Sequence, residues 1–231
     1  MSQSQISLLE RRRLVDIRLS EVGRLLATMG IRYRLVLEPT IHEPRRLSDL
    51  IHARCSAHVG RRLAAAGWQV EREVEIGSDR SRGWIDLLAY DPITGVLLVI
   101  EIKTEIHDVG QIERSMNWYQ REAWAAARRL GWQPRSAGSA LLVLQSETND
   151  RLIGANREVL AAAFPNRADA LIDVVTRESA PAEGRHLAMI DPRSHRARWL
   201  RRSRLDGRRS KAPYIDYIDA VRRLEQGSSR V

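Results

Sequence analysis

The sequence predicts an α/β protein in which a mixed sheet is flanked by helices, and three observations lead to this fold class. Several short segments show alternating or continuous apolar character, which is typical of strands. Longer segments before and after them carry apolar residues at helical spacing. The order along the chain is helix, three strands, helix, strand, which packs most naturally as one sheet between helices.

The expected elements of the main domain begin after a linker at 39–44. We expect Ser48 to cap the first helix, Gly67 to end it, and residues 92–95 to form a hairpin turn. The elements are a helix from Leu47 to about Ala66, strands at 68–76, 83–91 and 96–104, a helix at 108–130, a strand at 139–145, a helix at 149–163 and a short strand at 170–175.

We expect three parts: a helical segment over 1–44, the main α/β domain over 45–192 and a basic C-terminal extension over 193–231. In the first part, helical patterns at about 2–13 and 16–29 precede a short strand pattern at 31–37. The chain has no apolar run of the roughly 18 residues that a membrane helix needs, and no signal-peptide pattern. We therefore expect a cytoplasmic protein without a membrane partner. Cys55 is the only cysteine, which excludes an internal disulfide.

The charge balance favours a polyanionic partner. The net charge is +9 with a pI of about 10.6, which suits the phosphates of nucleic acid, although an Arg-rich solvated surface would give the same numbers. Residues 193–211 hold nine basic residues and one acidic residue, so they predict a phosphate-binding arm or a solvated tail. The candidate DNA-binding residues in this arm are Arg201, Arg202, Arg208 and Arg209.

Lysine is rare in this chain. Only Lys103 and Lys211 are lysines among the 38 basic residues, so arginine serves wherever a cation alone is needed. The pKa of a lysine can fall on burial, whereas an arginine stays protonated. A lysine at position 103 is therefore informative.

The hairpin turn fixes which residues oppose each other on the second and third strands. With a loop at 92–95, Asp91 pairs with Val96, and counting back places Asp86 opposite Glu101. Opposed residues share a side of the sheet, with Cβ atoms about 5 Å apart, and Lys103 falls on that side too. The other side is apolar and is expected to face the core through Ile85, Leu87, Ala89, Leu98, Ile100 and Ile102.

Two opposed carboxylates repel each other, and a divalent cation between them would remove that cost. Mg²⁺ is bound by one or two carboxylates together with water and phosphate oxygens, so Asp86 and Glu101 are candidate ligands of Mg²⁺ or Mn²⁺. Lys103 could then orient or deprotonate an attacking water, or stabilise charge on phosphorus. The alternative is a cross-strand salt-bridge cluster without catalysis.

These residues resemble the signature of the PD-(D/E)xK nuclease superfamily. The strand Gly83-Trp-Ile-Asp86 followed by Glu101-Ile-Lys103 is similar to its motif, with Ile85 in the place of the motif proline, and the element order over about 47–146 is similar to its restriction-endonuclease-like core. The resemblance implies that Asp86 and Glu101 bind metal and that Lys103 assists hydrolysis. Some members carry a glutamine where Gln111 stands, but with Asp108 it also fits a helix capping box.

A second resemblance lies at the N-terminus. Residues 2–10, SQSQISLLE, are similar to the recognition helix of Cro/repressor-type helix-turn-helix domains, which implies that Gln3, Ser4 and Gln5 contact base edges. The preceding helices of that motif are missing, so either the start codon lies upstream or the motif is a remnant. An ordinary amphipathic helix is the alternative.

The sequence thus predicts a metal-dependent DNA phosphodiesterase whose catalytic residues are Asp86, Glu101, Lys103 and Gln111. DNA is the expected partner, and a homodimer is compatible with the sequence. The rival is a catalytically inactive DNA-binding transcriptional regulator that keeps the nuclease fold. A structural or interaction module is a third alternative.

Overall fold

The computed structural model describes residues 19–30, 42–78, 81–178, 184–207 and 211–228. The chain forms two compact units, residues 1–41 and 42–231. In the first unit, helix α2 (Leu19–Thr28) confirms a helix within the predicted 16–29 segment, and Gly30 follows it with a φ of 70°, a left-handed conformation that glycine adopts without strain. The helix at 2–13, the strand at 31–37 and the residues Gln3, Ser4 and Gln5 lie outside the described residues.

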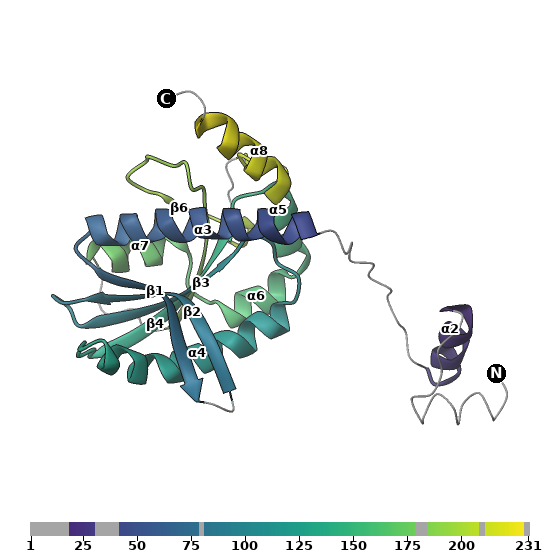
Figure 1. Ribbon diagram of the computed structural model, residues 1–231, viewed down its shortest axis with the longest axis horizontal. Coiled ribbons are helices and arrows are strands. Elements are labelled where there is room, and N and C mark those ends of the chain that lie inside the picture. The colour runs from purple at the N-terminus through teal and green to yellow at the C-terminus, as the bar shows by residue number, and fades with distance from the viewer. Residues whose placement is uncertain (1–18, 31–41, 79–80, 179–183, 208–210, 229–231) are drawn as a thin grey trace. The chain divides into compact units, whose positions relative to one another are not determined.

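The second unit contains a mixed sheet, as predicted (Figure 1). Its described strands are β1 (Gln69–Ser78), β2 (Ser81–Asp91), β3 (Val96–Lys103), β4 (Ser136–Leu144), β5 (Gly184–Ile190) and β6 (Leu200–Arg201), and they lie side by side in that order. β1, β2 and β3 are antiparallel, β3, β4 and β5 are parallel, and β6 is antiparallel to β5. The carboxyl ends of β3, β4 and β5 therefore meet at one edge of the sheet.

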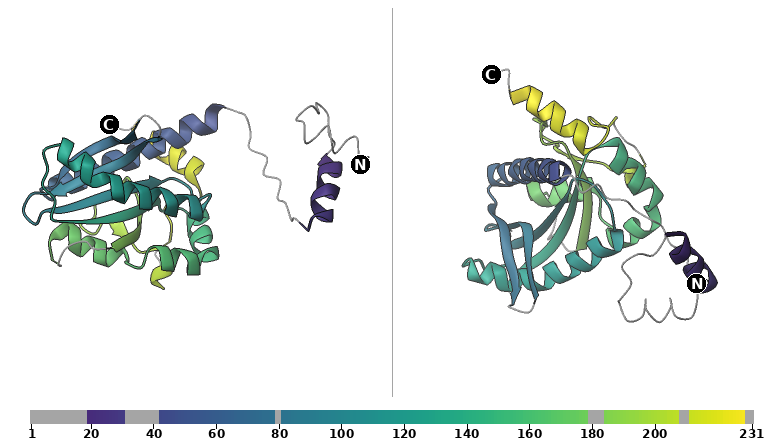
Figure 2. Two further views of the ribbon diagram at one scale, coloured as in Figure 1. Left: turned by 90° about the horizontal axis from the view of Figure 1, so that it is seen from below. Right: turned by 45° about the vertical axis from the view of Figure 1, so that its right-hand side comes forward.

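Helices cover both faces of this sheet (Figures 1 and 2). One face packs against α3 (His42–Ala65), α7 (Ala168–Thr176) and α8 (Tyr217–Ser228). The other face packs against α4 (Val109–Arg129), α5 (Glu147–Ala155) and α6 (Arg157–Ala163). β3 is buried on both sides, because its VLLVI run supplies apolar side chains to both layers, as the strands of parallel sheets usually do.

Two helices depart from the sequence prediction. α3 begins at His42, so Ser48 lies inside the helix and not at its cap; Pro44 is tolerated there because the first-turn N–H groups have no partner within the helix. The predicted helix at 149–163 is two helices that meet at Asn156.

The predicted strand at 170–175 is wrong, since these residues form α7. Leu171, Val174 and Val175 are buried at i, i+3 and i+4, the spacing of one helix face. The indole N–H of Trp68 donates to the Val175 carbonyl oxygen at 3.1 Å, which ties α7 to the start of β1. A six-residue segment with five apolar residues suits either structure, and tertiary packing favours the helix here.

Residues 193–231 fall within the same compact unit as the sheet. β6 pairs with β5, and α8 buries Ala220, Val221 and Leu224 in the core under α3. The Tyr214 side chain is also buried, and its hydroxyl donates to Asp191 at 2.7 Å. The sequence prediction missed β5, β6, the 3₁₀ helix η1 (Arg204–Asp206) and α8.

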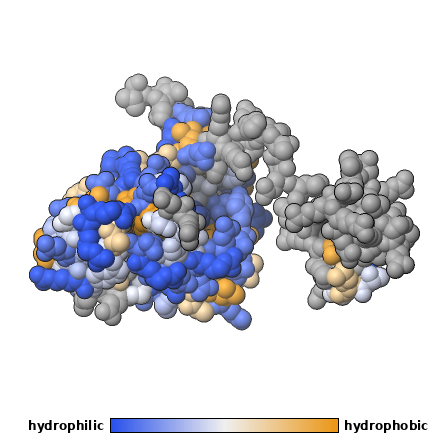
Figure 3. Space-filling model, turned by 60° about the horizontal axis from the view of Figure 1, so that its bottom comes forward, coloured by the Kyte–Doolittle hydropathy of each residue, from blue (hydrophilic) through white to orange (hydrophobic). Residues whose placement is uncertain are grey.

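None of the described helices is both long and apolar enough to cross a membrane. The face of the second unit in Figure 3 is mostly hydrophilic, with hydrophobic residues scattered over it. Scattered exposed apolar residues of this kind are normal for a protein surface.

A buried ion pair joins the β2–β3 turn to the end of α7. Asp91, which has no exposed surface, accepts two hydrogen bonds of 2.9 Å from the Arg177 guanidinium and one of 2.6 Å from the Thr94 hydroxyl. Burial alone would raise the pKa of Asp91, but the hydrogen bonds from Arg177, Thr94 and the Ile93 N–H outweigh it and lower the pKa to about 2.

This pair predicts a loss of stability in acid. The folded pKa of Asp91 lies below its ordinary value, so the ionised carboxylate stabilises the fold above about pH 4 and this contribution is lost as the pH falls towards 2. The lowered pKa of Asp91 corresponds to a contribution of about 2 kcal/mol to the free energy of unfolding. Urea unfolding of the parent and Asp91→Asn at several pH values checks this. The two free energies of unfolding should converge between pH 4 and 2, and parallel curves would contradict the prediction.

Candidate active site

The predicted hairpin register is confirmed, and it ends next to the candidate residues. β2 and β3 pair from Asp91↔Val96 through Leu88↔Val99 to Leu87↔Ile100, with no further pair beyond it. Asp86 and Glu101 therefore stand where the two strands separate. The turn between the strands is closed by the Gly95 N–H, which donates to the Asp91 carbonyl oxygen at 2.8 Å.

The Asp86 carboxylate lies in the gap between the strands. Its Oδ2 accepts a hydrogen bond of 2.7 Å from the Ile102 main-chain N–H, in place of a main-chain acceptor on β2. The same oxygen lies 3.1 Å from Nε2 of His52 on α3. No described residue donates to Oδ1 of Asp86, which leaves that oxygen available to a ligand.

The backbone around Asp86 is irregular on both of its sides. In the β1–β2 register Glu73 falls opposite Asp86, and its φ of 50° is left-handed, which is uncommon for a residue other than glycine. Ile85 packs under α4 while Leu87 packs under α3, so the prediction that both face one side is wrong. Backbone conformations of this kind cluster at functional sites.

Glu101 is a buried acid with an unfilled hydrogen-bonding oxygen. The residue is 4% exposed, its Oε1 accepts a hydrogen bond of 2.6 Å from Lys103 Nζ, and its buried Oε2 has no hydrogen-bond partner. Burial raises the pKa of Glu101 above its usual range, the charge of Asp86 raises it further, and Lys103 offsets part of this effect.

A hollow of about 250 Å³ lies beside Glu101 and Lys103, on the α4 side of the sheet. Gln111 lines it, as do side chains from the loop after β3 and from α4: Glu105, His107, Asp108, Ile112, Ser115 and Tyr119. Asp86 does not line the hollow. Asp108 caps α4, because its side chain accepts a hydrogen bond of 2.8 Å from the Gln111 main-chain N–H. Gln111 thus takes part in the helix cap and also lines the hollow.

The buried Asn149 holds the loop that follows β3. Its side-chain amide donates to the Thr104 and Leu144 carbonyl oxygens at 2.8 and 2.9 Å, and its oxygen accepts the Ile106 N–H at 3.2 Å. One side chain on α5 thus joins the ends of β3 and β4. The sequence gives no sign of this role of Asn149, because its contacts with Thr104 and Ile106 span more than 40 residues.

His52 was also missed, because its spacing to the other histidines gives no metal-binding pattern. It reaches Asp86 because α3 packs over the β2–β3 end of the sheet. The hydrogen bond to Asp86 raises the pKa of His52; burial lowers it, and the charge of Asp86 raises it again.

Asp86→Asn is therefore expected to lower the pKa of His52. Asparagine keeps an oxygen for the Ile102 N–H but removes the negative charge that favours the imidazolium. Titration of the His52 ring by NMR in EDTA measures this pKa. Asp108→Asn, which removes a carboxylate that lines the hollow and does not contact His52, is the control and should leave the His52 pKa unchanged. An unshifted His52 pKa in Asp86→Asn would contradict the geometry.

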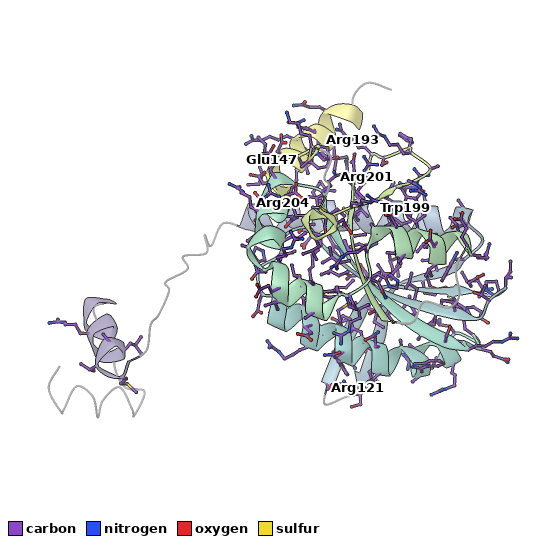
Figure 4. All side chains as sticks on the ribbon, turned by 180° about the vertical axis from the view of Figure 1, so that it is seen from behind. Arg121, Glu147, Arg193, Trp199, Arg201 and Arg204 are labelled. Atoms are coloured by element: carbon purple, nitrogen blue, oxygen red, sulfur yellow. The ribbon has the colours of Figure 1, made fainter. Side chains whose placement is uncertain are left out.

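The structure describes two of the four candidate arginines of the predicted DNA-binding arm. Arg201 lines a hollow of about 350 Å³ at the carboxyl ends of β4 and β5, together with Arg193, Arg196 and Lys211. Arg202 does not line this hollow and pairs with Asp169 instead. Arg208 and Arg209 lie outside the described residues. Arg193 and Arg201 are labelled in Figure 4.

The carboxylates of Asp86 and Glu101 are the side chains here that could hold a metal ion. Among the described residues no group of three or more His, Cys, Asp and Glu side chains could do so. Two carboxylates suffice for Mg²⁺, which keeps several waters and takes substrate oxygens as further ligands.

Comparison with known proteins adds no family to this picture. The sequence matches no protein-family model and none of the curated proteins.

Proposed function

We propose that this protein is a metal-dependent phosphodiesterase that cleaves DNA at the carboxyl end of β3. The observation that carries the proposal is the state of Glu101, a buried acid whose Oε2 has no hydrogen-bond partner and whose charge is opposed by that of Asp86. A buried polar atom without a partner costs about 1–3 kcal/mol, and more for a charged group, so such a group calls for an explanation.

A divalent cation fits this explanation. Carboxylate oxygens are the preferred protein ligands of Mg²⁺ and Mn²⁺, and Oε2 of Glu101 and Oδ1 of Asp86 have no described donor. When bound, such a cation would polarise a phosphoryl oxygen and lower the pKa of a coordinated water. Asp86 is itself held by the Ile102 N–H, so its position is fixed before any ligand arrives.

Lys103 is the candidate for handling the proton and the charge. Its Nζ lies 2.6 Å from Oε1 of Glu101, and the side chain is about one-third exposed at the edge of the hollow. From this position an ammonium group can stabilise negative charge on a phosphoryl group, and in its neutral form the amine can accept a proton from water.

DNA is the proposed substrate because cations lie along the same sheet edge. β3, β4 and β5 are parallel neighbours, so the basic hollow at the ends of β4 and β5 lies at the edge where Lys103 ends β3. Strands in a sheet are about 4.8 Å apart, so β3 and β5 lie about two strand spacings from each other. Ligands of open α/β sheets commonly bind beyond the carboxyl ends of the strands.

The arrangement also supports the proposed membership of the PD-(D/E)xK superfamily. The order α3, β1, β2, β3, α4, β4 matches the core that the resemblance implies, with Asp86 on β2 and Glu101 and Lys103 on β3. The restriction-endonuclease-like fold is part of this proposal.

The test is incubation of the full-length protein with plasmid and branched DNA in Mg²⁺, Mn²⁺ or EDTA. Cleavage that needs a divalent cation and disappears in Asp86→Asn supports the proposal. If neither metal gives cleavage of either DNA while the protein binds DNA, the inactive DNA-binding regulator takes its place.

A further inference from the structure

A second basic hollow lies outside the candidate active site, and only part of its lining comes from the predicted DNA-binding arm at 193–211. It has a volume of about 580 Å³ and is lined by Arg151 and Ala155 of α5, Arg157 of α6 and Arg204 of η1, together with Gly154 and Gly207. No acidic residue is among the described side chains that line it. Three guanidinium groups from three different elements thus surround one space floored by small residues.

None of these three arginines has an acidic partner among the described residues. Within the described part of the chain, Arg157 and Arg204 make no ion pair or side-chain hydrogen bond, and Arg151 contacts only the Thr148 hydroxyl at 3.2 Å. Other arginines pair with carboxylates, as Arg82, Arg177, Arg185, Arg202 and Arg223 do. Three neighbouring positive charges repel one another, and a bound anion would offset this repulsion by attracting all three.

Hydrogen bonds fix the backbone that carries the arginines of the hollow, and they connect it to the candidate active site. Ser203 and Asp206 cap η1 reciprocally, with the Ser203 N–H donating to Asp206 at 2.6 Å, which fixes the short turn that carries Arg204. α5 carries Arg151, and two residues earlier Asn149 is bonded to the loop that follows Lys103. α5 therefore connects the hollow to the end of β3.

We infer that this three-arginine hollow binds a backbone phosphate of a nucleic-acid strand, as a second anchor for the substrate of the site at Lys103. The choice of nucleic acid rests on the proposed function. It also rests on exposure: Arg151, Arg157 and Arg204 are all exposed, whereas a pocket for a small ligand buries most of that ligand. Arginines open to solvent suit backbone phosphates, which most protein–DNA hydrogen bonds contact.

Binding measured without cleavage tests the inference. The affinity of the full-length protein for a fluorescein-labelled DNA duplex is measured in EDTA over a series of salt concentrations. Arg151→Gln, Arg157→Gln and Arg204→Gln should each weaken binding about three- to tenfold and reduce the slope of log K against log salt, by at most about 0.9, the value for one lost phosphate. The variants should unfold at the parent temperature, since the three side chains are exposed.

Arg121→Gln is the matched control. It removes the same charge from an exposed position on α4, and Figure 4 shows Arg121 far from Arg204. Its affinity and salt slope should stay near those of the parent. If the three hollow variants behave like Arg121→Gln, the effect is one of net charge only and the inference is overturned.

Two substitutions at Gly154 give an independent test. A Cβ at this position would lie 3.4 Å from Cδ of Arg204, so Gly154→Asp places a carboxylate among the arginines and should weaken DNA binding at least as much as Arg204→Gln. Gly154→Ala adds the same Cβ without charge and should bind as the parent does. Equal binding by both variants would overturn the inference.

Two further outcomes separate the possible sources of phosphate and the two proposals. If inorganic phosphate binds at this hollow by calorimetry but DNA affinity is unchanged in Arg204→Gln, the ligand is a free phosphate compound and the nucleic-acid inference falls. If the parent cleaves no DNA but the hollow variants lose binding and slope, the proposed catalytic function falls and this inference stands.

Discussion

Lys103→Arg is expected to lower the rate of metal-dependent DNA cleavage at least about 100-fold while leaving folding and DNA binding intact. Proton transfer by a positioned side chain contributes about 10²- to 10⁴-fold to catalysis, and arginine has no accessible neutral form with which to take part. Lys103 also stands 2.6 Å from Glu101 beside a hollow of about 250 Å³, so the larger guanidinium would intrude on the space proposed for substrate. Single-turnover cleavage by the parent and the variant measures the effect.

The other lysine of the chain supplies the matched control. Lys211 is exposed and lines the basic hollow at the ends of β4 and β5, where positive charge is the proposed requirement. Lys211→Arg makes the same chemical change and should cleave at nearly the parent rate. Should Lys103→Arg cleave DNA as fast as the parent, Lys103 acts as a structural cation and its proposed catalytic role is wrong.

Arg177→Gln is expected to destabilise the fold by about 3–5 kcal/mol, the cost of breaking a buried ion pair by removing one partner. Asp91 has no exposed surface, and both guanidinium hydrogen bonds of 2.9 Å would be lost with its charge still buried. Urea unfolding at pH 7 measures the free energy. The Arg177→Gln, Asp91→Asn double variant should recover part of the loss, because the remaining partners carry no charge.

An exposed pair in the same fold serves as the control for this prediction. Arg202 and Asp169 form an ion pair with both side chains more than 40% exposed. Exposed pairs contribute about 0–1 kcal/mol, so Arg202→Gln should change the free energy of unfolding by less than that. Equal effects of Arg177→Gln and Arg202→Gln would contradict the assignment of Asp91 as a buried, charged partner.

The part of the fold that the sequence predicted is the part set by local signals. The hairpin turn at 92–95 determined the β2–β3 register, and the VLLVI run identified β3 as a buried strand. β5 was missed because its GRHLAMI sequence begins with polar residues, and its place in the sheet depends on parallel pairing with β4, more than 40 residues away. Residues 170–175 form a helix because their buried positions suit α7, which their apolar run alone could not reveal.

The candidate site divides in the same way. The hairpin register predicts that Asp86, Glu101 and Lys103 lie close together. The structure gives the contact of Lys103 with Glu101 at 2.6 Å and places Asp86 just beyond the last pair of the β2–β3 ladder. The contacts of His52 with Asp86 and of Asn149 with Thr104 depend on how α3 and α5 pack against the sheet, and no local pattern encodes them. The separation of β2 from β3 at Asp86 likewise follows from its side chain taking the Ile102 N–H.

The central claim is that Asp86 and Glu101 together hold a divalent cation. Anomalous scattering from crystals soaked in Mn²⁺ tests it most directly, because the signal reports the position of the metal and not only its presence. We expect one strong peak within coordination distance of both carboxylates, at about 2.0–2.3 Å from their oxygens, and its loss in Asp86→Asn. The absence of a peak between these two side chains, at a Mn²⁺ concentration that supports cleavage, would contradict the account.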